Sequence, residues 1–226
     1  MALVDHWPFY GLTVRTPRVE LRSPDDDLAA ALGELAAKGV HDPSFMPFSF
    51  PWTDAPVDDL PRNSLQHYWQ NRAQLSPEQW HLSLAVLVEG DPVGGASLLA
   101  EHFAVRRMFE TGSWLGMTFQ GQGLGAELRH ACLHLGFAGL GAAVATTSAF
   151  EDNGPSLGVT RKLGYEPNGE DSLVRRGQSG RLLRFRMTRE HWEANVRRDD
   201  IELDGVEACL DLLGAGTAPV SDDGGS

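Results

Sequence analysis

Gln120-Gly121-Gln122-Gly123-Leu124-Gly125 is the stretch on which the interpretation of this chain depends. It lies between a predicted strand, residues 113–117, and a predicted helix that runs from about Ala126 to Phe137. Three glycines in five positions let the backbone turn tightly and leave successive N–H groups unscreened by side chains. Next to a helix N-terminus, such N–H groups form a binding site for phosphate. The stretch therefore indicates a phosphate-bearing ligand, with a purely structural turn as the alternative.

Two other phosphate-binding motifs fit this stretch poorly. A P-loop needs Gly-Lys-Ser/Thr after the glycines, whereas Leu124-Gly125-Ala126 follows here. A dinucleotide fingerprint, Gly-x-Gly-x-x-Gly, opens a parallel βαβ unit. Gly121 and Gly123 match its first two positions and Ala126 is tolerated at the third, but no parallel βαβ pattern precedes them. Both motifs are therefore disfavoured.

Hydrophobic periodicity predicts strands and helices on both sides of the glycine loop. Alternating side chains over residues 80–88, followed by the turn Glu89-Gly90-Asp91-Pro92, predict a hairpin. Acidic residues 25–27 suit the start of a helix, and Gly39 suits its end. The predicted strands are a strand pair or one long strand within 12–22, then 80–88, 93–99, 108–117, 144–150 and a hairpin from 165 to 187. The predicted helices are 28–38, 63–75, 126–137, 156–162, one capped by Thr188, and one over 203–213.

Composition sets limits on the class of protein. The chain has 226 residues, of which 42% are hydrophobic and 22% charged, as in a soluble globular protein. No apolar run is long enough to span a bilayer and no secretory signal pattern opens the chain, so we expect a cytoplasmic protein without a membrane partner. Cys132 and Cys209 are the only cysteines, which argues against a disulfide framework or a metal site. A net charge of −12 argues against nucleic acid and is compatible with a cationic amine.

A second stretch gives the glycine loop its context. Asn153 and Ser156 are followed by Lys162-Leu163-Gly164-Tyr165. Together with Gln120, Gly123 and Gly125, these residues resemble the motifs of the GCN5-related N-acetyltransferase (GNAT) superfamily. Residues 16–22, Thr-Pro-Arg-Val-Glu-Leu-Arg, are similar to the first strand of its Rim-type branch, which acetylates protein N-termini. The chain as a whole is also similar to an actinobacterial branch of the superfamily that includes a succinyl-CoA user. The resemblance covers about residues 12–187.

The resemblance implies a fold and a domain organisation. We expect a mixed α/β GNAT fold, with a largely antiparallel central sheet flanked by helices and extra C-terminal helices. A single domain would cover residues 1–213, with the motif core at 12–187 and a helical extension at 188–213. Residues 214–226 are small, polar and acidic, which predicts a disordered tail.

The resemblance also implies an acyl donor, acetyl-CoA or succinyl-CoA. The strand before the loop would pair its backbone with the pantetheine arm, Gly116 would allow a bend, and the loop would hold the pyrophosphate. A succinyl carboxylate would need a cation, for which Arg106, Arg107 and His102 are candidates. The expected donor-binding residues are Leu115, Met117, Gln120, Gln122, Gly123, Gly125, Ala126, Asn153, Ser156 and Lys162. Asn153 as a helix cap and Lys162 as a C-terminal helix cation also have purely structural explanations.

The catalytic residues are less well marked. Many GNAT enzymes protonate the leaving thiolate with a tyrosine, but Thr160 stands at that position. Ser148 is the candidate substitute, since Rim-type enzymes use a serine in that region. Candidate bases for the amine are Glu110, and Glu101 or His102 on the neighbouring strand, depending on strand register. Each of these residues could equally be an ordinary solvated side chain.

Two functions remain open from the sequence. The first is transfer of an acetyl or succinyl group from CoA to the primary amine of a small molecule or peptide. The second is a non-catalytic GNAT fold that binds CoA as a sensor or partner module. Aromatic residues on the proline-rich segment 45–52 are expected to form a wall of the acceptor site or a separate hydrophobic cluster. The apolar stripe over 203–213 is expected to dock on the domain or on a second subunit, which predicts a homodimer or a higher homo-oligomer.

Overall fold

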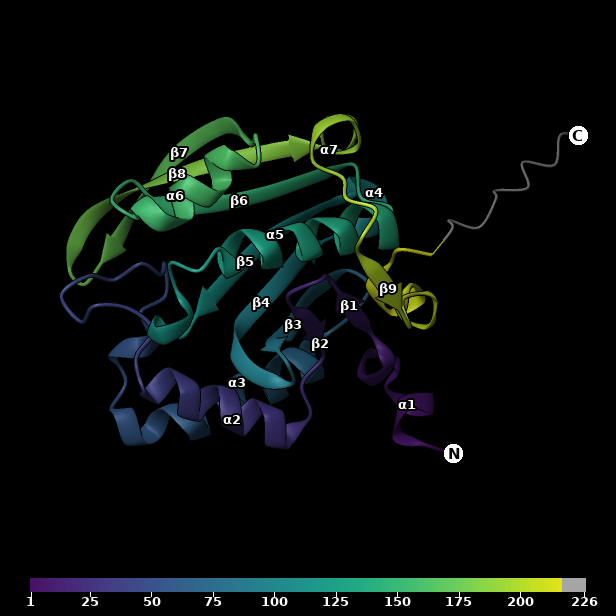
Figure 1. The fold of residues 1–226 in the computed structure, drawn as a ribbon, viewed down its shortest axis with the longest axis horizontal. Coiled ribbons are helices and arrows are strands. Elements are labelled where there is room, and N and C mark those ends of the chain that lie inside the picture. Colours follow the sequence, from purple (N-terminus) through teal and green to yellow (C-terminus); the bar gives the residue numbers. More distant parts are fainter. Residues whose placement is uncertain (217–226) are drawn as a thin grey trace, which may run out of the picture.

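A single nine-stranded sheet organises the computed structural model, which describes residues 1–216 (Figure 1). Its strand order is β7-β8-β6-β5-β4-β3-β2-β1-β9, and every neighbouring pair is antiparallel except β5 and β6. The expected mixed α/β fold with a largely antiparallel sheet is confirmed. The strands are β1 Thr13–Arg15, β2 Glu20–Arg22, β3 Gln79–Val88, β4 Asp91–Glu101, β5 Met108–Leu115, β6 Val144–Phe150, β7 Glu166–Arg175, β8 Gln178–Thr188 and β9 Glu202–Asp204.

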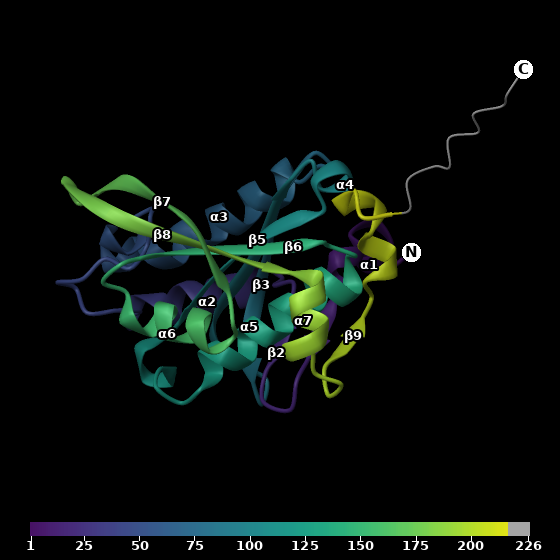
Figure 2. The same ribbon diagram turned by 90° about the horizontal axis from the view of Figure 1, so that it is seen from above.

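Helices cover both faces of this sheet (Figures 1 and 2). α2 and α3 lie on one face, and α5 and α6 lie on the other. Among residues 1–216, no helix combines the length and the apolar character that a membrane span requires. The helices are α1 Leu3–His6, α2 Asp26–Ala37, α3 Leu60–Gln74, α4 Phe103–Arg106, α5 Leu124–His134, α6 Gly154–Lys162 and α7 Arg189–Asn195; short 3₁₀ turns cover Pro8–Gly11, Trp52–Asp54, Val57–Asp59, Met117–Phe119, Glu207–Cys209 and Asp211–Leu213, and a π turn, Leu135–Gly139, continues α5.

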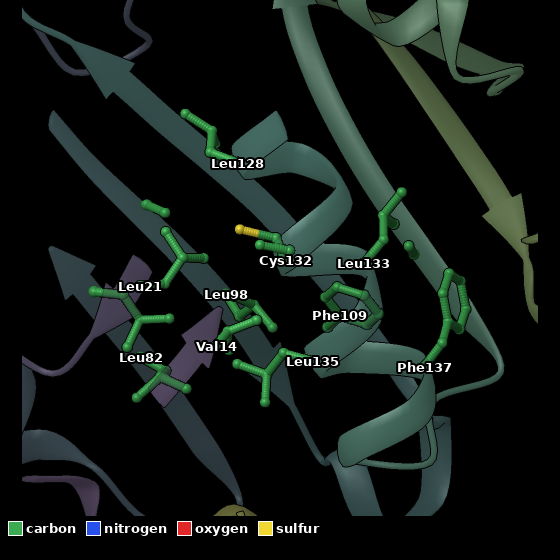
Figure 3. Packing of buried hydrophobic residues seen from close by; sticks show 14 of the residues in the cluster. Val14, Leu21, Leu82, Leu98, Phe109, Leu128, Cys132, Leu133, Leu135 and Phe137 are labelled. Atoms are coloured by element: carbon green, nitrogen blue, oxygen red, sulfur yellow. The ribbon is translucent and has the colours of Figure 1, made fainter. Parts of the chain in front are cut away.

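The main core lies between the sheet and α5 (Figure 3). Leu128 and Cys132 of α5, with Leu135 just after it, point toward the strands, and each is at most 1% exposed. The ring of Phe109 on β5 packs so closely against Gly136 that a Cβ there would lie 2.1 Å from it. This packing fixes α5 against β5 and therefore fixes the position of the glycine loop at the start of α5.

The two parallel strands separate soon after they meet. Only Met108, Phe109 and Glu110 of β5 pair with β6, in register with Val144 to Thr146. Beyond that point β5 continues to Leu115 and β6 to Phe150 without further pairing between them. α5 crosses in front of the place where they separate (Figure 1). The sheet therefore has a V-shaped gap whose narrow end lies at Glu110 and Thr146.

The C-terminal segment differs from the prediction. α7 forms as expected, and the Thr188 side chain accepts a hydrogen bond from the His191 N–H at 3.2 Å. The predicted helix over 203–213 is wrong: Glu202–Asp204 forms β9, which pairs with the open edge of β1, and two 3₁₀ turns follow. Gly205, with φ of +69°, passes so close to Gly11 that a Cβ would lie 2.2 Å from its carbonyl oxygen. An extended pairing followed by a glycine turn replaces the helix.

The apolar stripe of this segment packs on the chain's own domain. Cys209 and Leu213 are fully buried in the main core, so the stripe no longer supports a homodimer. The beginning of the predicted disordered tail is also ordered, because Arg107 donates hydrogen bonds to the carbonyl oxygens of Ala215 and Gly216. The rest of that prediction falls on residues 217–226, which lie outside the described residues.

Candidate functional site

The glycine loop presents a row of free backbone donors. Gly121 and Gly123 have φ of +73° and +81°, conformations that L side chains rarely adopt. Within residues 1–216, none of the six N–H groups from Gly121 to Ala126 has a hydrogen-bond acceptor. They surround the N-terminus of α5, where the helix dipole adds partial positive charge. An oxyanion with several acceptor oxygens fits this arrangement.

Two glutamine side chains hold the loop in shape. Gln120 donates from Nε2 to the carbonyl oxygens of Val40 at 2.7 Å and Leu115 at 2.8 Å. Gln122 donates from Nε2 to the Thr118 carbonyl at 2.8 Å. Both side chains are thus engaged with the protein backbone. In this arrangement Gln120 acts on the site by fixing the loop between β5 and the end of α2, rather than by pointing at a ligand.

Arg18 is a site residue that the sequence analysis missed. From the turn between β1 and β2, it donates to the Gln122 carbonyl at 2.9 Å, and a Cβ on Gly123 would lie 3.2 Å from its Nη1. Arg15 and Arg22 of the same hairpin are ion-paired with acidic side chains, but no ion pair within residues 1–216 includes Arg18. Arg18 also lines a groove of ≈ 590 Å³ beside the loop. Its guanidinium therefore adds a full positive charge to the free N–H groups. Arg18 belongs to the motif Thr16-Pro17-Arg18, but no local sequence pattern predicts its contact with the distant Gln122.

Beyond the point of separation, β5 exposes backbone groups to the gap. Gly116 donates to Val93 on the β4 side at 3.0 Å, so the alternation along a strand turns the N–H groups of Ser113 and Leu115 toward the gap. Met117, by contrast, lies in a 3₁₀ turn and donates its N–H to the Gly39 carbonyl at 3.0 Å. Of the two predicted positions, Leu115 keeps a backbone donor facing the gap and Met117 does not.

Glu110 and Ser148 meet at the narrow end of the gap. Ser148 donates from Oγ to Oε1 of Glu110 at 3.1 Å. Phe109 and Thr111, the neighbours of Glu110, are buried toward α5, so the Glu110–Ser148 pair lies on the opposite face of the sheet, the face of α2 and α3. Gly112 is on that same face, and a Cβ there would meet nothing within 4 Å. The structure thus brings together two of the three predicted catalytic side chains beside open space.

The third predicted side chain, His102, lies elsewhere. Glu110 pairs with Leu99, and β4 continues past that point to Glu101 before His102 turns into α4. At about 3.4 Å per strand residue, His102 is about 10 Å farther along. Arg106 pairs with Glu101, and Arg107 donates to the carbonyl oxygens of Ala215 and Gly216, so two of the three cations proposed for a succinyl group are engaged within the protein.

α6 places the second motif beside α5. Asn153 caps α6, since its Oδ1 accepts from the Ser156 N–H at 3.2 Å. Thr160 is fully buried, and its Oγ1 donates to the Ser156 carbonyl at 3.0 Å, so its hydroxyl is not presented to the gap. Lys162 is exposed in the last turn of α6. The predicted acid position is therefore occupied by a core residue.

The aromatic segment forms a wall that reaches β5. The rings of Phe48 and Trp52 lie 5.3 Å apart, and Trp52 lies 5.6 Å from Trp114 of β5. The hairpin of β7 and β8 holds this segment: Arg175 donates to the Met46 carbonyl at 3.2 Å, and Arg176 donates to Asp54 at 2.9 Å. These hydrogen bonds from Arg176 keep the pKa of Asp54 below its usual range. The wall stands on the same face as the Glu110–Ser148 pair.

The row of free backbone donors at the start of α5 lies next to the split between the two parallel strands β5 and β6. This is the arrangement that the resemblance to the GNAT superfamily leads us to expect. The family model described as "Acetyltransferase (GNAT) domain" matches residues 18–166, well over half of the chain. The chain therefore belongs to the GNAT acetyltransferase domain family.

Solved structures agree with this fold. The crystal structure of a probable acetyltransferase is 20% identical, with a TM-score of 0.64, over 80% of this chain and 98% of that chain. RimL, a ribosomal L7/L12 α-N-protein acetyltransferase solved with coenzyme A, is 17% identical, with a TM-score of 0.60, over 76% of this chain and 95% of that one. The microcin C7 self-immunity acetyltransferase MccE, solved with acetyl-CoA and AMP, is 18% identical, with a TM-score of 0.60, over 76% and 93% of the two chains.

Proposed function

We propose that this protein transfers an acyl group from a CoA thioester to a primary amine, as a member of the Rim-type branch. The observation that carries the proposal is the row of six free N–H groups from Gly121 to Ala126, beside the gap between β5 and β6. A pyrophosphate on this row would be bound by charge-assisted hydrogen bonds, with Arg18 supplying a side-chain cation. That RimL was solved with CoA and MccE with acetyl-CoA supports this choice of donor.

The pantetheine arm would follow the free edge of β5. The four residue steps of strand from Leu115 back to Thr111 cover about 14 Å, a length comparable to an extended pantetheine arm. The backbone groups of Ser113 and Leu115 would pair with its amides as an added strand would. The thioester would then reach the narrow end of the gap. Asn153 and Ser156 would order the neighbouring start of α6, and Lys162 would face the adenosine phosphates.

The Glu110–Ser148 pair would serve the acceptor. Amine attack on the thioester carbonyl forms the C–N bond and breaks the C–S bond, and the electron pair leaves on sulfur. Glu110 would take the proton that the attacking nitrogen loses, and Ser148 would give its own proton to the thiolate and recover one from Glu110. The hydrogen bond of 3.1 Å between the two side chains supports this relay. An α-amine, with a pKa of about 7.7–8.0, needs less help than a lysine at about 10.4.

The side chains around the gap also suggest which acyl group is transferred and which acceptor enters. Acetyl is the proposed acyl group, since Arg106 is paired with Glu101 and Arg107 is bonded to the carbonyl oxygens of Ala215 and Gly216. The acceptor is a small-molecule or peptide amine that enters beside the aromatic wall of Phe48, Trp52 and Trp114. We place the protein in the cytoplasm, and a homodimer or higher homo-oligomer stays a prediction that light scattering checks.

The test is a binding and turnover comparison on the full chain. Acetyl-CoA should raise the melting temperature by mass action, and NAD, ATP and GTP should not. CoA release should then require an amine from a panel of peptides, polyamines and amino acids, with succinyl-CoA as a second donor. Equal stabilisation by NAD and acetyl-CoA would overturn the donor assignment. Binding without CoA release across the whole panel would instead support the alternative, a non-catalytic CoA-binding module.

A further inference from the structure

Arg129 of α5 is a buried cation without a counter-charge. Its side chain is 5% exposed, yet no ion pair within residues 1–216 includes it. Its Nη1 donates to Thr147 Oγ1 at 3.1 Å, and no described residue forms a hydrogen bond with its Nε. A buried charge is costly to fold unless it is paired, and arginines are almost never fully buried without a partner. Within residues 1–216, the guanidinium of Arg129 therefore has no anion to pair with.

A second unpartnered donor lies beside it. Tyr165, just before β7, is 6% exposed, and its ring centroid lies 5.9 Å from the Arg129 guanidinium carbon. Its hydroxyl has no hydrogen-bond partner among the described residues. Burial raises the pKa of Tyr165, so its hydroxyl keeps its proton near neutral pH. Burial also raises the pKa of the neighbouring Cys132 to about 12, so this thiol supplies no negative charge. The cluster is a set of donors with net positive charge.

The cluster lies at the narrow end of the gap. Thr147 donates to the Thr111 carbonyl at 3.1 Å, and Thr111 donates to the Thr146 carbonyl at 3.3 Å. These bonds join β5 and β6 immediately after their last pair, Glu110 with Thr146. Arg129 thus approaches the end of the gap from the α5 face, while the Glu110–Ser148 pair approaches it from the other face.

We propose that Arg129, with Tyr165, is a catalytic residue pair that stabilises the negative charge formed on sulfur when the thioester is cleaved. This inference rests on the proposed function, which places the thioester at the narrow end of the gap. When the C–S bond breaks, its electron pair becomes a thiolate at this end. The guanidinium of Arg129 and the hydroxyl of Tyr165 supply the positive charge and the donor that this thiolate lacks in an apolar core, and Ser148 then supplies its proton.

The stability of Arg129 variants separates this role from a structural one. Arg129→Met keeps most of the side-chain volume and removes the unpaired charge, so the melting temperature should stay the same or rise. A structural arginine would lower it. Arg72→Met is the matched control: Arg72 bonds to Asp26 and to the Pro24 carbonyl, both at 2.7 Å, far from the gap. Its replacement should lower the melting temperature and leave kcat unchanged.

The decisive measurement is the titration of CoA bound to the full-length protein, followed by the ultraviolet absorbance of the thiolate. An opposite charge within a few ångströms lowers a pKa by about 1–3 units, so the bound thiol should titrate at least about one unit below free CoA. Arg129→Met should remove most of this shift and Arg129→Lys should retain part of it, with CoA affinity changed less than about threefold. For kcat, loss of such a stabilising group typically costs about 10²–10³-fold. Tyr165→Phe should show a smaller loss in the same direction.

The outcomes are distinct. If the wild-type protein does not bind CoA in calorimetry, the proposed function fails and this inference fails with it. If CoA binds but the thiol titrates equally in wild type and Arg129→Met, the inference alone is wrong. If Arg129→Met lowers the melting temperature as Arg72→Met does, while kcat and the thiol pKa are unchanged, Arg129 is structural. A loss of kcat together with a raised thiol pKa and an unchanged melting temperature supports the proposal.

Discussion

Gly123→Val is the sharpest test of the phosphate cradle. Gly123 has φ of +81° at the N-terminus of α5, and a Cβ there would lie 3.2 Å from Arg18 Nη1. The valine would therefore strain the backbone and fill the space beside Arg18 that we assign to the pyrophosphate. We expect the fold to persist and CoA binding to be lost.

The valine affects both the stability of the fold and the affinity for CoA. A left-handed conformation costs an L residue about 1–2 kcal/mol, and a β-branched residue is at the upper end of that range or above it. A domain of this size has about 5–15 kcal/mol of stability, so most of it remains folded. Each kcal/mol lowers the melting temperature of such a domain by about 2–4 °C. Loss of even one hydrogen bond to a charged phosphate, at about 1.5–3 kcal/mol, weakens binding by roughly 10- to 150-fold.

Calorimetry with CoA and a thermal melt give the two readouts. Gly177→Val is the matched control, because Gly177 has φ of +78° in the hairpin turn and a Cβ there meets nothing within 4 Å. It should lower the melting temperature by a similar amount and leave the dissociation constant for CoA unchanged. A Gly123→Val protein that melts lower but binds CoA within threefold of wild type would refute the cradle.

Three further predictions follow from single side chains. Ser148→Ala should lower kcat about tenfold or more, because it removes the proton donor beside Glu110. Thr160→Val should change kcat less than threefold, since Thr160 is buried with its hydroxyl bonded inside α6. Steady-state assays that give the reverse ranking would contradict both roles. Arg18→Ala should weaken CoA binding about tenfold in calorimetry but leave pantetheine binding unchanged, because pantetheine lacks the phosphates. An equal loss of affinity for both ligands would mean that Arg18 only shapes the loop. Burial, and in addition the charge of His67, lowers the pKa of His81 from 6.5 to about 4. The neutral form of His81 therefore contributes stability that is fully present above pH 6.5 and declines as the pH falls toward about 4. His81→Gln should reduce the fall in melting temperature between these pH values, and identical melting curves for both proteins would show that His81 does not titrate there.

Local patterns in the sequence were enough to predict much of the fold. Apolar alternation predicted the central strands, and the acidic start and glycine end predicted α2, because these are local preferences of the backbone. The glycine loop was also legible, since left-handed turns demand glycine wherever they occur. The same local reasoning failed at 203–213, where the open edge of β1 and the close approach of Gly205 to Gly11 favour a strand and turns over an isolated short helix.

The assembly of the site could not be predicted in this way. Strand register brought Glu110 and Ser148 within hydrogen-bonding distance and carried His102 away, and one residue of slip would have reversed both faces. Thr160 is a buried core residue, and Arg129 is buried with no counter-charge in the part of the chain that the structure describes. From the sequence alone, an arginine in a helix is expected to be exposed. Arg18 reached Gln122 across 104 positions of chain. These relations depend on which elements pack together, and packing is set by contacts far apart in the sequence that local patterns do not encode.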